Sequence, residues 1–159
     1  MLKRLRNRWE IPRPIPMAET ATILVVEDNE LLLSLLRRAL EREGYAVIPA
    51  PSGVEMMKML YRSMPDLIVL DVGLPDADGR DLLATLKKDP RTFHIPVLVW
   101  SGRDPDSNRR IALELGAEDY VEKGVPSRLV PKIERILLRL SERELAEARA
   151  SIPPRQPVA

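Results

Sequence analysis

The sequence predicts a doubly wound α/β fold, in which a five-stranded parallel sheet carries helices on both faces. Two observations predict it. Short, β-branched apolar runs alternate with amphipathic helical patterns between residues 18 and 148, and each run is followed by a helix. Successive βαβ units make the strands parallel, and right-handed crossovers place helices on both faces. In such sheets the functional crevice lies beyond the carboxyl ends of the strands.

The five predicted strands are short, apolar segments bounded by polar residues, glycine or proline. They cover residues 23–26, 45–48, 67–70, 96–100 and 120–121. None approaches the length that a membrane-spanning helix needs, so we expect no membrane span.

The predicted helices lie between these strands, and several carry clear start or stop signals. Asn29 can cap the first helix, and Ser52 forms a capping box with Glu55 at the start of the second. The predicted helices cover residues 30–43, 53–60, 80–88, 107–115 and 127–140. The composition of residues 141–150 favours a continuation of the last helix.

The chain of 159 residues has the size of one ordinary domain. Composition divides it into a basic, proline-containing tail (1–20), the α/β domain (21–140), and a helix extension with a proline-rich tail (141–159). Met17 is a second candidate start of translation, which would make residues 1–16 an upstream addition. The native status of that segment stays open.

Charge and cysteine content narrow the class of protein. The formal net charge is +1, which gives no strong field to attract nucleic acid or membrane. Cysteine is absent, so disulfides and thiolate metal sites are excluded. The basic N-terminus has no apolar stretch of the kind found in secretory signals. We therefore expect a cytoplasmic protein.

Reactive side chains follow four of the predicted strands. Glu27 and Asp28 follow the first strand, and Asp71 follows the third. Ser101 follows the fourth, and Lys123 follows the fifth. Three carboxylates crowded together repel one another, and Mg²⁺, which prefers oxygen ligands, relieves that repulsion. A lysine and a hydroxyl opposite the metal can hold phosphoryl oxygens. The pattern predicts a site that receives phosphate on a carboxylate.

Four segments carrying these residues resemble the receiver domain of two-component response regulators. They are Ile23–Asn29, Leu70–Gly79, Trp100–Gly102 and Gly116–Lys123. The resemblance covers residues 21–140, with matching spacings between the segments. It implies a flavodoxin-like sheet with strand order 2-1-3-4-5, as in the stand-alone chemotaxis regulators. It also implies a signal receiver that catalyses its own phosphorylation and dephosphorylation rather than an enzyme with another substrate.

The resemblance implies roles for the acidic residues. Asp71 would be the phosphoacceptor. Asp28 and Asp71 would bind Mg²⁺ directly together with the backbone carbonyl of Gly73, and Glu27 would act through a metal-bound water.

It also implies a switch. Ser101 would hydrogen-bond the phosphoryl group and Lys123 would pair with it, while Tyr120 would turn inward when Ser101 moves. The family usually has proline after the lysine, whereas Gly124 follows here. Glycine accepts unusual backbone angles but does not enforce them, so the orientation of Lys123 is to be tested.

Simpler interpretations of the same residues stand beside these roles. Glu27 and Asp28 could be a solvated pair at a helix start, and Tyr120 could be an ordinary half-buried strand residue. Asp76 and Asp78 are predicted to be turn residues.

Three function classes compete. The first is a phosphoaspartate-accepting receiver without its own output domain. Its partners would be a sensor histidine kinase or histidine phosphotransfer protein and a downstream protein effector, with no direct DNA binding. A second copy, bound through the last helices, is a further candidate partner. A phosphatase of the haloacid-dehalogenase type would need an aspartate where Gly73 stands. A receiver-fold scaffold that works without phosphorylation is the alternative.

Overall fold

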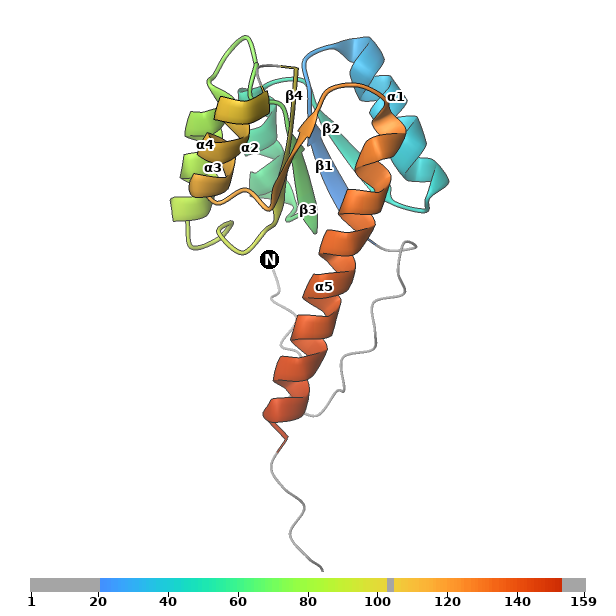
Figure 1. Cartoon of the computed structure of the whole chain (residues 1–159), viewed down its shortest axis with the longest axis vertical. Coiled ribbons are helices and arrows are strands. Elements are labelled where there is room, and N and C mark those ends of the chain that lie inside the picture. The colour runs from blue at the N-terminus through green and yellow to red at the C-terminus, as the bar shows by residue number, and fades with distance from the viewer. Residues whose placement is uncertain (1–20, 103–104, 153–159) are drawn as a thin grey trace, which may run out of the picture.

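Five parallel strands form one sheet in the computed structural model, which describes residues 21–102 and 105–152 (Figure 1). Their order is β2-β1-β3-β4-β5, all neighbours running parallel. The strands are β1 (Thr22–Val26), β2 (Ala46–Ala50), β3 (Leu67–Leu70), β4 (Val97–Ser101) and β5 (Asp119–Glu122). The predicted fold class and strand order are confirmed.

The helices follow the strands in the predicted alternation. They are α1 (Glu30–Arg42), α2 (Gly53–Arg62), α3 (Gly79–Lys88), α4 (Pro105–Glu114) and α5 (Leu129–Ala150), with a 3₁₀ turn, η1 (Pro126–Arg128), before α5. Both predicted N-cap residues bind the start of their helices. The side chain of Asn29 accepts the N–H of Leu32 at 3.0 Å, and Ser52 Oγ accepts the N–H of Glu55 at 3.1 Å.

Helices cover the sheet from both sides, α1 and α5 on one face and α2, α3 and α4 on the other (Figure 1). Each face buries its own apolar cluster. Leu36 and Leu40 of α1 and Ile133 of α5 meet alternate strand residues on one side. Met56 of α2 and Leu83 of α3 meet the other alternate set. Burying such side chains stabilises each by about 1.5–3 kcal/mol before conformational entropy is subtracted, so the strand ends are held on a rigid base.

Most element boundaries differ from the predicted ones by one or two residues, and two of these differences lie at prolines. β2 continues through Pro49, which an edge strand tolerates since its outer side needs no N–H donor. α4 begins at Pro105 rather than at residue 107, since the first turn of a helix needs no intrahelical N–H either.

Helix α5 is continuous for 22 residues and projects well beyond the sheet (Figure 1). The predicted tail of residues 1–20 and the end of the chain from 153 on lie outside the described residues. None of the described helices combines the length and the apolar character that a membrane span requires.

Candidate functional site

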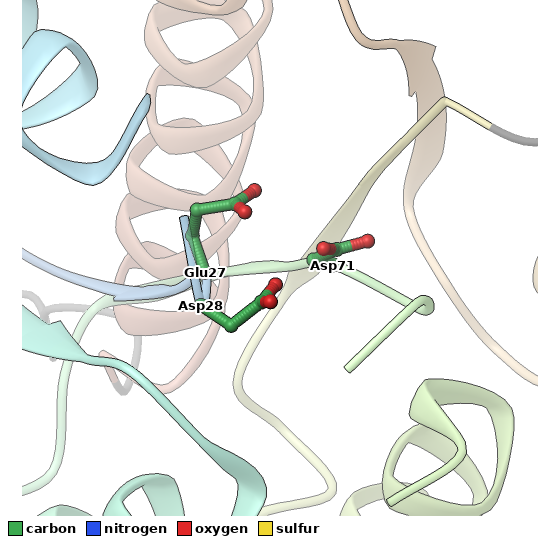
Figure 2. A group of neighbouring side chains, drawn as sticks. All are labelled: Glu27, Asp28 and Asp71. Carbon is green, nitrogen blue, oxygen red and sulfur yellow. The ribbon is translucent and has the colours of Figure 1, made fainter. Parts of the chain in front are cut away.

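Three acidic side chains meet at the carboxyl edge of the sheet. Glu27 and Asp28 follow β1, and Asp71 follows the neighbouring strand β3 (Figure 2). One carboxylate oxygen from each lies within 4.8 Å of the others. Glu27 and Asp71 are buried, whereas Asp28 is exposed. Their oxygens can therefore serve one small cation that enters from the side of Asp28.

The backbone continues the sheet pattern into the site and fixes where these side chains start. The N–H of Asp71 donates to the carbonyl of Val26 at 3.0 Å, and the N–H of Glu27 donates to that of Ala50 at 3.1 Å. Helix α3 begins directly against this segment. A Cβ at Gly79 would lie 2.3 Å from Val72 Cα and 2.7 Å from the carbonyl oxygen of Asp71. Only glycine allows this approach.

Lys123 reaches two of the three carboxylates. Its Nζ lies 2.9 Å from Asp71 Oδ2 and 2.7 Å from Glu27 Oε2. Burial on its own would lower the pKa of Lys123, but the hydrogen bonds to Asp71 and Glu27 outweigh burial and raise it. The lysine is thus held in its charged form against Asp71.

The orientation of Lys123 does not depend on proline at the next position. Gly124 has no atom within 4 Å of the place that a Cβ would occupy. Instead, the N–H of Lys123 donates to the carbonyl of Ser101 at 2.9 Å, which continues the β4–β5 ladder by one residue.

Glu27 is an unusually buried carboxyl group for a site rich in negative charge. Burial raises its pKa, and hydrogen bonds from Lys123 and from the N–H of Asn29 offset only part of that rise. One lysine faces three carboxylates, so the fully ionised cluster has a net charge of −2 (three negative, one positive). This charge and the all-oxygen donor set suit Mg²⁺.

Gly73 lies in the loop after β3, and its N–H donates to Asp71 Oδ1 at 2.9 Å. With Lys123 on Oδ2, both oxygens of the Asp71 carboxylate are therefore oriented by the protein. Such fixed hydrogen bonds hold a reacting group in place before a reaction begins.

Ser101 and Tyr120 lie deep in the adjoining strands. Ser101 is the last residue of β4 and is 1% exposed, and Tyr120 of β5 is equally buried. Tyr120 belongs to the apolar cluster on the α4 side of the sheet, so it is more buried than a half-buried strand residue. Its carbonyl accepts a hydrogen bond from Arg109 of α4 at 3.1 Å.

The two aspartates predicted as turn residues have more specific contacts. Asp78 caps α3 by accepting the N–H of Arg80. Asp76 binds the start of α2, a helix far away in sequence. No periodic or spacing signal in the sequence indicates that contact, because it joins a loop and a helix start that only the fold brings together.

Comparison with known proteins identifies the family of the chain. Residues 23–134 match the response regulator receiver domain, so the chain belongs to the receiver family of two-component response regulators. Receiver domains accept a phosphoryl group, remove it by their own phosphatase activity and bind Mg²⁺ at an acidic pocket. They interact with histidine kinases and effectors.

Individual relatives agree with this assignment. The alkaline phosphatase synthesis transcriptional regulatory protein PhoP of Bacillus subtilis is 42% identical over 120 residues, which are 76% of this chain and 49% of PhoP. The chain thus spans about half the length of this relative. A CheY-like receiver domain protein from Methanospirillum hungatei superposes with a TM-score of 0.71 at 29% identity, over 79% of this chain and 98% of that one. The Mn²⁺-bound form of the response regulator Rcp1 gives a TM-score of 0.62 at 26% identity, over 79% and 94%.

Proposed function

We propose that this chain accepts a phosphoryl group on Asp71 from a phosphohistidine and signals through protein contacts. One observation carries the proposal: the buried Asp71 carboxylate is oriented on one oxygen by Gly73 and on the other by Lys123, beside two further carboxylates. A buried aspartate that served only the fold would not need this acidic surrounding.

The chemistry follows from the donor and the acceptor. A carboxylate oxygen of Asp71 forms a bond to phosphorus while the bond from phosphorus to the imidazole nitrogen breaks, and the electron pair leaves with the imidazole. Lys123 pairs with the phosphoryl oxygens, and the Ser101 hydroxyl donates to one of them. Water later attacks phosphorus, which releases inorganic phosphate and restores the Asp71 carboxylate.

Mg²⁺ would be held by Asp28, Asp71 and the Gly73 carbonyl, with Glu27 acting through a water ligand. When bound, it neutralises negative charge that the carboxylates and the incoming phosphoryl group bring together. The solved Mn²⁺ form of the related Rcp1 supports a divalent cation in this family.

Exposure to a small phosphodonor with Mg²⁺ tests the proposal. We expect an acid-labile mass increase of one phosphoryl group, located at Asp71. A chain that stays unmodified with every donor and with phosphohistidine partners would favour the scaffold alternative.

Asp28→Asn should weaken Mg²⁺ binding by at least about tenfold, since a direct charged ligand should contribute no less than outer partners do. Wild-type affinity is itself expected to be weak, because few ligands come from the protein. Titration calorimetry measures both. Asp66→Asn, on an aspartate at the opposite end of β3, is the control, and equal affinity in Asp28→Asn and wild type would show that the metal site is misplaced.

Exposed apolar residues near the site suit docking of the phosphodonor protein. Leu31 of α1 is 68% exposed and lies three residues after Asp28. Leu35, one turn further along α1, and Val125, two residues after Lys123, are also exposed. We propose that a sensor kinase or histidine phosphotransfer protein binds here, in the cytoplasm. A protein effector rather than DNA would read the phosphorylated state.

The projecting part of α5 has a face suited to a second copy of the chain. Apolar or small residues recur there at alternating spacings of three and four, the pattern of a two-stranded coiled coil. They are Leu138, Ser141, Leu145, Ala148 and, just past the helix, Ile152. Leu138 and Ile152 are exposed.

Charges beside this face favour a parallel pair. Glu144 and Arg149 occupy the two flanking positions of the heptad, five residues apart, so Glu144 of one copy would face Arg149 of the other. Neither residue takes part in the ion pair described within this part of α5, which joins Arg143 and Glu147 at 3.1 Å. We propose a weak parallel dimer through this face.

Charge reversal tests the dimer. Glu144→Arg and Arg149→Glu should each weaken self-association by about tenfold, because two exposed pairs turn from attraction to repulsion. The double variant should restore it. Sedimentation equilibrium over a range of concentrations measures the constants. A wild-type chain that stays monomeric, or a double variant no tighter than the singles, would contradict the proposal.

A further inference from the structure

Asp76 joins the loop that follows β3 to the start of helix α2. Its Oδ1 accepts the N–H of Gly53 at 3.0 Å, and its Oδ2 accepts the N–H of Val54 at 3.1 Å. The pKa of Asp76 is lowered, mainly by the hydrogen bond from the Gly53 N–H and next by that from the Val54 N–H. Both carboxylate oxygens of the exposed Asp76 side chain therefore accept hydrogen bonds from the N-terminal end of α2.

Helix α2 already has a cap of its own. Ser52 accepts the N–H of Glu55, as an N-cap residue does. Asp76 takes the two N–H groups that precede it, and these also lack partners inside the helix. Because Asp76 comes from a segment more than twenty residues later, its bonds attach the loop to α2 as well as completing the cap.

Packing reinforces this attachment. A Cβ at Gly53 would lie 3.2 Å from Ala77 Cβ and 3.0 Å from Leu82 Cδ1. The loop and the first turn of α3 therefore lie directly against the beginning of α2, and a Cβ at position 53 would be tightly packed between them.

The attached loop carries the backbone of the proposed metal site. It is held at one end by the bond from the Gly73 N–H to Asp71 and at the other by the Gly79 N–H, which donates to the carbonyl of Val72 at 3.1 Å. Between these two ends, the Asp76 side chain binds the loop to α2. Gly73, whose carbonyl is the proposed ligand, lies three residues before it.

We propose that Asp76 is a positioning residue for the metal site: by fastening the 72–78 loop to α2, it fixes the Gly73 carbonyl where the cation needs it. This inference rests on the proposed function, since it concerns the same Mg²⁺. It assigns to Asp76 an effect on metal affinity although its hydrogen bonds go to α2 and not to the acidic cluster.

Two variants separate positioning from helix capping. Asp76→Ala and Ser52→Ala each remove side-chain oxygen from the same end of α2, and both should lower thermal stability. Only Asp76→Ala should also raise the Mg²⁺ concentration for half-saturation, by about tenfold, as losses of outer partners of metal ligands do. The maximal rate of phosphorylation by acetyl phosphate at saturating Mg²⁺ should change much less, since Asp71 and Lys123 remain.

The outcomes are distinct. Equal Mg²⁺ affinity in Asp76→Ala and wild type, or equal weakening in Ser52→Ala, would reduce Asp76 to a cap and overturn the inference alone. A wild-type chain that binds no Mg²⁺ would overturn the proposed function itself. Asp76→Asn, which keeps one carbonyl acceptor and nearly the same size, should fall between wild type and Asp76→Ala. If the alanine variant fails to fold, Asp76→Asn decides the question. A Mg²⁺ affinity of Asp76→Asn equal to that of the wild type would then contradict the positioning role.

Discussion

Asp71→Asn should abolish modification by a small phosphodonor. The substitution keeps the size of the side chain and one oxygen for the Gly73 N–H, so the fold should be unchanged. It removes the carboxylate whose oxygen attacks phosphorus, and an amide is a far poorer nucleophile. Loss of a covalent nucleophile removes the reaction rather than slowing it modestly. Intact-protein mass spectrometry after incubation with acetyl phosphate and Mg²⁺ measures the result.

A matched control uses an aspartate close in sequence but outside the site. Asp81 lies exposed on α3, and Asp81→Asn should be labelled as wild type is. Undiminished labelling of Asp71→Asn would place the acceptor elsewhere, and the scaffold alternative would then account better for the buried acidic cluster.

The sequence predicted the fold well where hydrophobic pattern and local caps agree. β3 occupies the predicted residues 67–70. All four residues are apolar and buried, so the change to polar residues on either side marks both ends of the strand. Other boundaries were less accurate, and the end of β2 shows why. Whether Pro49 ends a strand depends on that strand lying at the sheet edge, and edge position is a property of the whole sheet.

The site was predictable because parallel strands bring their carboxyl ends to one edge. That rule places Glu27, Asp28 and Asp71 together without any knowledge of side-chain contacts. The link between Asp76 and α2 follows from no such rule. Nor could the sequence show that Lys123 reaches Asp71 with glycine at position 124, since the β4–β5 ladder determines its direction.

The second large effect concerns transmission of the signal. Phosphorylation adds negative charge and new acceptor oxygens at Asp71. The hydroxyl of Ser101 is predicted to donate a hydrogen bond to one of these oxygens. Movement of Ser101 would alter the packing around Tyr120, whose carbonyl is bonded to Arg109 of α4. The buried Tyr120 and this bond connect β5 with α4, so the change should spread to the surface of α4, β5 and α5. Such coupling requires two states that the phosphoryl group binds unequally.

Hydrogen exchange with and without beryllofluoride, which mimics the phosphoryl group, tests this transmission. In the wild type, protection should change over α4, β5 and α5 and little over α1. Ser101→Ala should still accept phosphate, more slowly, but lose most of the change outside the crevice loops, because the hydroxyl that links the phosphoryl group to β4 is gone. Ser34→Ala, on the exposed side of α1, should behave as wild type. Two results would contradict this switch: wild-type changes confined to the loops around Asp71, or changes that persist in full in Ser101→Ala. Ser101 and Tyr120 would then not form the switch, and the signal would leave through the loops around Asp71.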